Sequence, residues 1–155
     1  MIPVAFDYER ATSTEQALSL LAEHGDEAKL MAGGHSLLPL MKYRLAAPAV
    51  LIDIGRLEEL SYVRDEGEEL AIGALTRHCE VEQNDLVRSQ VGLLAAATSQ
   101  VGDPQVRHRG TIGGAMAHGD PASDLPAALI ALRGSLVIDG PSGRRQVEAD
   151  SFFTG

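Results

Sequence analysis

Residues 28–45 of this chain read AKLMAGGHSLLPLMKYRL, with Ala32-Gly33-Gly34-His35-Ser36 at the junction of two differently patterned segments. The short apolar run 28–32 predicts a strand, and residues 37–45 predict a helix that tolerates a proline in its first turn. A glycine pair at such a junction lets the backbone turn sharply and present successive amides beside the positive end of a helix dipole. The stretch is therefore either an anion cradle or an ordinary strand-to-helix turn.

The residues on either side of this stretch predict a small α/β unit. Ser13 and Gln16 have the spacing of a capping box, and Gly25 is placed to end the helix that follows it. A second buried strand is predicted over 51–54. The order is α-β-loop-α-β, and the unit is expected to be too small to bury its sheet on both faces.

Beyond residue 55 the pattern changes to hairpins and apolar helices. Hairpins are predicted around the turns 65–68 and 139–143, and a helix over 92–100. Segment 102–110 has no periodicity and predicts an irregular loop. Thr76 and Asp85 are candidate helix N-caps. Either Ser123 or Asp124 is expected to start a further helix, which runs to Leu132. We place a boundary near Gly55, with residues 1–55 as a small α/β lobe and 56–155 as a larger α+β lobe.

Composition excludes several classes of function. The 155 residues carry a net charge of −9, which disfavours nucleic acid as a partner. A single cysteine, Cys79, excludes a disulfide framework and a cysteine-ligated cluster held by this chain alone. The sequence has no apolar run long enough to span a membrane, so we expect a cytoplasmic protein. His35, His108 and His118 lack the regular spacing of metal ligands, and no metal site is predicted.

A second glycine pair follows much later, in Arg109-Gly110-Thr111-Ile112-Gly113-Gly114-Ala115. Two amide-rich turns are suited to a diphosphate, because it is an anion with many hydrogen-bond acceptors. Asp124, a little further on, has two interpretations: a helix N-cap, or a carboxylate that accepts a hydrogen bond from a ligand.

Residues 32–41, AGGHSLLPLM, and residues 109–125, RGTIGGAMAHGDPASDL, resemble the two FAD-binding signatures of molybdenum-hydroxylase flavoproteins. That family comprises the medium subunit of aerobic carbon monoxide dehydrogenase and the flavin domain of xanthine dehydrogenase, and the resemblance favours the former. It runs the whole length of the chain. It implies an α+β fold, the two-lobed FAD-binding domain of the vanillyl-alcohol-oxidase (PCMH) type, without the C-terminal part that relatives possess.

The resemblance also implies the binding residues. The backbones of both signatures would bind the pyrophosphate, and Asp124 would hydrogen-bond the cofactor. Ala115 stands where relatives often carry asparagine. The implied FAD-binding residues are Ala32, Gly33, Gly34, His35, Ser36, Thr111, Ile112, Gly113, Gly114, Ala115 and Asp124, and none of them is catalytic.

The function implied is an oxidoreductase subunit that passes electrons from [2Fe–2S] clusters through FAD to an external acceptor. Molybdopterin is expected on a large partner subunit and the clusters on a small one, in a dimer of heterotrimers that could associate peripherally with a membrane. Arg107 and Arg109 would either dock on the iron–sulfur partner or merely brace their own loop. Two alternatives remain: a stand-alone FAD oxidoreductase of the same fold, and a nucleotide-binding module without redox function.

Overall fold

A computed structural model describes residues 1–153 of the chain. The chain divides into two compact units, Met1–Glu58 and Glu59–Gly155. Each unit has its own cluster of buried apolar side chains. Among the helices of residues 1–153, none is long and apolar enough to cross a bilayer.

The first unit is built on a three-stranded parallel sheet. Its strands are β1 (Asp7–Arg10), β2 (Ala28–Met31) and β3 (Val50–Asp53), in the order β1-β3-β2. Both outer strands pair in register with β3, so Arg10 and Met31 both lie opposite Asp53. The carboxyl ends of all three strands therefore meet at one edge of the sheet, which is where open parallel sheets bind ligands.

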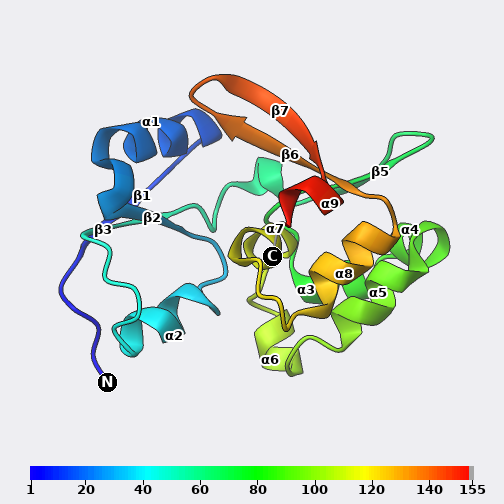
Figure 1. Ribbon diagram of the computed structural model, residues 1–155, viewed down its shortest axis with the longest axis horizontal. Helices are drawn as coiled ribbons and strands as arrows, with labels where there is room; N and C mark the ends of the chain where they lie inside the picture. The colour runs from blue at the N-terminus through cyan, green and yellow to red at the C-terminus, as the bar shows by residue number, and fades with distance from the viewer. Residues whose placement is uncertain (154–155) are drawn as a thin grey trace. The chain divides into compact units, whose positions relative to one another are not determined.

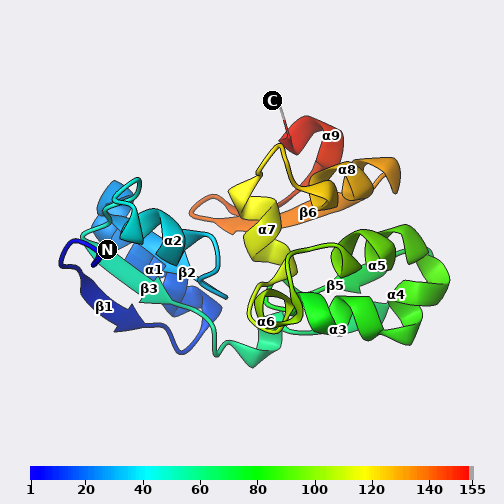
Figure 2. The ribbon, with the colours of Figure 1, turned by 90° about the horizontal axis from the view of Figure 1, so that it is seen from below.

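Two helices cover this sheet, α1 (Thr14–His24) and α2 (Leu37–Lys42), and they lie on opposite sides of it (Figures 1 and 2). A short 3-10 turn, Gly25–Glu27, connects α1 to β2. Val50 and Ile52 belong to the cluster that packs against α1, and Leu51 between them is equally buried. Side chains alternate across a strand, so β3 is buried on both faces. The expectation that this unit could not bury its sheet on both sides is wrong for the central strand.

The ends of α1 follow the predicted local signals. The Ser13 hydroxyl accepts a hydrogen bond from the Gln16 amide, and Gly25 ends the helix at φ +52. The Gln16 side chain reaches back one residue further than a capping box requires, because its Oε1 accepts from the amide of Thr12.

The second unit combines helices with two antiparallel hairpins. The hairpins are β4 (Val63–Asp65) with β5 (Leu70–Ile72) and β6 (Ser135–Gly140) with β7 (Gly143–Glu148), as predicted around both turns. The helices are α3 (His78–Gln83), α4 (Asp85–Gln90), α5 (Gly92–Ser99), α6 (Pro104–Arg107), α7 (Ile112–His118), α8 (Asp124–Ala131) and α9 (Ala149–Phe152), after a 3-10 turn at Glu58–Leu60. Helix α5 packs against α3, α4 and α8. The buried core of the second unit consists of Val81, Val87, Leu94, Ala95, Ile112, Met116 and Leu125.

Two predicted N-caps lie one residue away from the observed ones. The N-cap of α3 is Arg77, whereas the hydroxyl of the predicted residue, Thr76, donates to the Tyr62 carbonyl. The N-cap of α4 is Asn84, whose Oδ1 accepts from two amides, and the predicted Asp85 is the first helical residue. An Asn side-chain oxygen caps a helix N-terminus as well as an Asp carboxylate does. N-cap propensity therefore cannot decide which of two adjacent Asn and Asp residues is the N-cap.

Segment 102–110 is not irregular throughout. It contains the one-turn helix α6, in which the Asp103 carboxylate accepts from the Val106 amide and Pro104 occupies the first turn. One turn is too short to show a hydrophobic period, which is why the segment predicts a loop.

Candidate functional site

The first glycine loop lies at the carboxyl end of β2, between that strand and α2. The Ile54 amide donates to the Met31 carbonyl at 3.0 Å, which keeps the residue after β3 beside the loop. The loop therefore lies at the edge of the sheet where the strands end. Ala32, Gly33 and Gly34 are half-buried there, and His35 and Ser36 are exposed.

The main-chain N–H groups of this loop are free to donate. The carbonyls of Gly34 and Ser36 accept from Leu38 and Leu40 at 3.0 and 3.2 Å, which begins α2. Within residues 1–153, the amides of Gly33 through Ser36 have no acceptor. Gly34 has φ +78, a conformation that L side chains rarely adopt. Successive unengaged amides at a turn can bind an anion.

The His35 side chain folds back onto its own loop. Its Nδ1 lies 3.2 Å from the Gly33 carbonyl oxygen, and the Nδ1–H tautomer would donate to it. The ring thereby stabilises the turn that presents the amides. That His35 acts on a ligand mainly through its backbone stays a prediction.

Asp53 is a residue that sequence reasoning missed. Its Oδ1 accepts from the Gly55 amide at 2.8 Å, and its Oδ2 accepts from the Tyr8 hydroxyl. The bond to Asp53 raises the pKa of Tyr8 above its ordinary value. A Cβ on Gly55 would stand 3.3 Å from the Ala32 carbonyl oxygen, so the turn held by Asp53 passes close to the first loop. The sequence signal that could have pointed to Asp53 is its place at the end of a predicted buried strand.

The second glycine pair is helical, although the sequence predicts a loop there. Thr111 is the N-cap of α7, and its Oγ1 accepts from the Gly114 amide at 3.2 Å. The Ile112 amide donates to Thr76 and the Gly113 amide to Ala74, at 3.0 and 2.9 Å. The amides at the start of α7 are therefore engaged within the protein, in contrast to those of the first loop.

Packing accounts for both glycines of this second pair. A Cβ on Gly113 would lie 2.5 Å from the Cβ of Ala74, and one on Gly114 would lie 2.8 Å from the Thr111 hydroxyl. Real Cβ atoms do not approach so closely. These glycines let α7 lie against the chain segment of Ala74 and let Thr111 cap the helix.

Ala115 and Asp124 occupy different surroundings in the second unit. Ala115 is half-buried against the core cluster. The N-cap of α8 is Ser123, whose Oγ accepts from the Leu125 amide, so the N-cap interpretation of Asp124 is wrong. Asp124 is exposed at the rim of a groove of about 540 Å³ between α5 and α8, which Gln100 also lines. Its carboxylate makes no hydrogen bond or ion pair with the residues that the structure describes.

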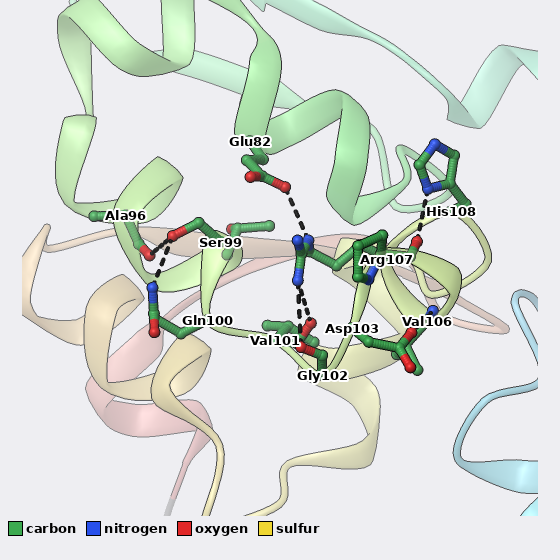
Figure 3. Close-up of polar contacts among 12 residues, drawn as sticks. Glu82, Ala96, Ser99, Gln100, Val101, Gly102, Asp103, Val106, Arg107 and His108 are labelled. Carbon is green, nitrogen blue, oxygen red and sulfur yellow. Dashed lines mark hydrogen bonds and ion pairs between the residues drawn. The ribbon is translucent and has the colours of Figure 1, made fainter.

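Arg107 and Arg109 differ, although they are neighbours in the sequence. The Arg107 guanidinium pairs with Glu82 at 2.9 Å and donates to the carbonyls of Val101 and Gly102 (Figure 3). These contacts show that Arg107 braces its loop, and docking on a partner stays a prediction. Arg109 is exposed, and its side chain makes no hydrogen bond or ion pair within residues 1–153.

The described residues contain no metal centre. Across residues 1–153, no three His, Cys, Asp or Glu side chains lie together as metal ligands would. Cys79 is a half-buried free thiol in α3.

The structure groups the predicted residues into two sets. Ala32 through Ser36 share one loop in the first unit. In the second unit, Thr111 through Ala115 form the start of α7, which packs against α8, the helix that Asp124 begins. That the two sets bind one ligand stays a prediction.

Comparison with known proteins gives consistent matches over the whole chain. It is 50% identical over 155 residues to the carbon monoxide dehydrogenase medium chain of Hydrogenophaga pseudoflava, covering 100% of this chain and 54% of that one. It is 46% identical to the glyceraldehyde dehydrogenase medium chain of Sulfolobus acidocaldarius, covering 100% and 55%. The structure superposes on carbon monoxide dehydrogenase from H. pseudoflava with a TM-score of 0.97 at 50% identity, covering 100% and 54%.

The chain thus spans about half the length of the curated relatives it matches. Residues 4–155 match the family described as the FAD binding domain in molybdopterin dehydrogenase. The α+β architecture agrees with the fold that the two signatures imply. The chain therefore belongs to the family of FAD-binding domains of the molybdopterin dehydrogenases.

Proposed function

We propose that this chain binds FAD as part of the medium subunit of a molybdenum-containing dehydrogenase of the aerobic carbon monoxide dehydrogenase type. The observation that carries the proposal is the first loop, at the carboxyl edge of a parallel sheet, where four successive amides have no acceptor among residues 1–153. Family membership supports FAD as the ligand. Carbon monoxide would be the substrate of the complete enzyme.

The residues of the first loop fit a diphosphate. The amides of Gly33 through Ser36 would donate to its oxygens, and the exposed Ser36 hydroxyl would add a donor. Gly34 permits this backbone course, since its φ is +78. Bound FAD would supply the exchange of electrons between a one-electron donor and a two-electron acceptor.

The second signature would contribute differently. Its first two helical amides already donate to Ala74 and Thr76, so the first loop would supply most of the main-chain donors. We propose that Thr111 through Ala115 line the cofactor through their surfaces and that the exposed Asp124 carboxylate accepts a hydrogen bond from it. The two units would then be the two lobes of one FAD-binding domain.

The proposed assembly has a molybdopterin-binding large subunit and a [2Fe–2S] small subunit, as a cytoplasmic dimer of heterotrimers. The enzyme from H. pseudoflava has a molybdenum cofactor, in that structure without its Mo-pyranopterin moiety. The single cysteine of this chain also means that clusters must come from elsewhere. Family membership argues against a module without redox function, and the relatives' medium-chain names argue against a stand-alone oxidoreductase.

The test begins with the native protein. We expect it to release FAD on denaturation, identified by chromatography and mass spectrometry. Native mass spectrometry of the same preparation should show molybdenum- and iron-containing partner chains. Release of FMN, or absence of flavin after reconstitution with FAD, would contradict the cofactor; a fully active FAD-containing monomer would contradict the assembly.

A further inference from the structure

We propose that Arg77 and His78, at the start of α3, are positioning residues that hold the beginning of α7 in the position required to bind the cofactor. The inference rests on the proposed function and assigns a role to residues outside both signatures. Three kinds of contact join this pair to residues 108–112, and all of them lie within the second unit.

The first contact is main-chain pairing. The His78 amide donates to the Gly110 carbonyl and the Ile112 amide donates to the Thr76 carbonyl, both at 3.0 Å. Arg77 and Thr111 lie opposite each other between these bonds, as an isolated antiparallel bridge. The N-cap residue of α7 is thus paired directly with the N-cap residue of α3.

The second contact is the Arg77 guanidinium. Its Nη1 donates to the carbonyls of His108 and Arg109, at 2.9 and 3.3 Å. The Arg77 backbone is itself held, because its amide donates to the Glu80 carboxylate at 2.9 Å. A charged donor bonded to two successive carbonyls restrains the chain just before Gly110.

The third contact is the His78 ring. It is 4% exposed, and a Cβ on Gly110 would lie 2.7 Å from its Cδ2, so the ring fills the space beside that glycine. Its Nδ1 is buried without a hydrogen-bond partner among the described residues. Burial, with a contribution from the Arg107 charge, lowers the pKa of His78 to about 4, so the ring is neutral near pH 7. The contact of the ring with Gly110 is therefore one of packing, and its Nδ1 makes no hydrogen bond to the described residues.

These contacts explain why the start of α7 can serve a ligand although its amides are engaged. Pairing with Thr76 and Ala74 removes the freedom of the helix start, and the Arg77–His78 pair fixes the segment that leads into it. Thr111 through Ala115 would then present a surface of defined position to FAD. A ligand bound by positioned surfaces loses affinity when the support is removed, without loss of a direct contact.

The experiment compares Arg77→Ala with Arg77→Lys and with Arg145→Ala, all in the complete protein. Arg145 is a matched control, because it is exposed on β7 and its side chain makes no hydrogen bond within residues 1–153. We expect Arg77→Ala to weaken FAD binding about tenfold and to change the visible circular dichroism of the bound flavin. Arg77→Lys keeps one charged donor and should restore part of the FAD affinity and part of the flavin dichroism. Arg145→Ala should match the unaltered protein in both measurements.

A second measurement separates this inference from the proposed function. Amide exchange at Ile112 and Gly113 should be faster in Arg77→Ala than in Arg145→Ala, with or without FAD. Equal FAD affinity and flavin dichroism in these two variants would overturn the positioning role. If the unaltered protein binds no FAD, the proposed function fails. The exchange rates then still test the restraint: faster exchange in Arg77→Ala than in Arg145→Ala would support it, and equal rates in these two variants would refute it.

Discussion

Gly34 has the backbone conformation on which the amides of the first loop depend. A Cβ there would meet Leu38 Cδ1 at 3.0 Å, and the positive φ adds backbone strain. We expect Gly34→Val to weaken FAD binding at least tenfold, since the strained loop would withdraw its donors. His35→Ala should have a smaller effect, because only the bond to the Gly33 carbonyl is lost. Equilibrium titration with FAD measures both.

Gly67 provides the matched control. Its φ is +91 and a Cβ there would meet nothing within 4 Å, so Gly67→Val carries a comparable backbone strain in a hairpin turn of the other unit. It should lower the free energy of unfolding by about 1 kcal/mol and leave FAD affinity unchanged. Equal loss of affinity in both glycine variants would mean that instability, and not the loop, weakens binding.

His78 makes stability depend on pH. Its pKa is about 4 in the folded protein and near 6.5 when unfolded, so between these values only the unfolded chain takes up the proton. Stability from this group is fully present above pH 6.5 and falls as the pH decreases towards 4, by up to about 3 kcal/mol. Urea unfolding at several pH values should show a flatter dependence for His78→Phe. Parallel curves for both proteins would contradict the assignment.

At the scale of elements, the end of α8 contains an unfavourable residue. Arg133 has φ +53, and the amide of Gly134 closes the helix by donating to the Leu129 carbonyl at 2.9 Å. This is the position of a helix C-terminus that normally holds glycine. Arg133→Gly should raise the free energy of unfolding by about 1 kcal/mol, measured by urea denaturation.

Arg133→Ala serves as its control, because alanine keeps the Cβ that causes the strain. It should leave stability near that of the unaltered chain. A similar gain in the alanine and glycine variants would show that the arginine side chain, and not its backbone conformation, is the unfavourable feature.

At the scale of the whole molecule, the two units have separate cores. Ile52 is fully buried in the cluster of the first unit, and Leu94 is 4% exposed in that of the second. Ile52→Ala and Leu94→Ala should each cost about 2–5 kcal/mol. Hydrogen exchange should become faster mainly within residues 1–58 in the first variant and within 59–153 in the second. Uniform loss of protection in either variant would contradict independent cores.

Much of the local structure could be predicted from residues close together in the chain. Ser13 caps α1 and Gly25 ends it because the atoms involved lie within one helical turn. The junction at residues 32–36 has the predicted strand before it and a helix after it, although α2 ends three residues earlier than predicted, at Lys42. Both hairpins form around the predicted turns. The two signatures, by resemblance, were sufficient to indicate the family.

Other features were decided by contacts between residues far apart in the sequence. Strand β1 exists because it pairs with β3, and its own residues show no clear pattern. The two glycine pairs look alike as sequence, yet within residues 1–153 the amides of the first pair have no acceptor, whereas at the second pair the Ile112 and Gly113 amides donate to the carbonyls of Thr76 and Ala74. Whether a donor is available to a ligand depends on which acceptor packs against it. That acceptor lies far earlier in the chain, so only the tertiary structure determines it.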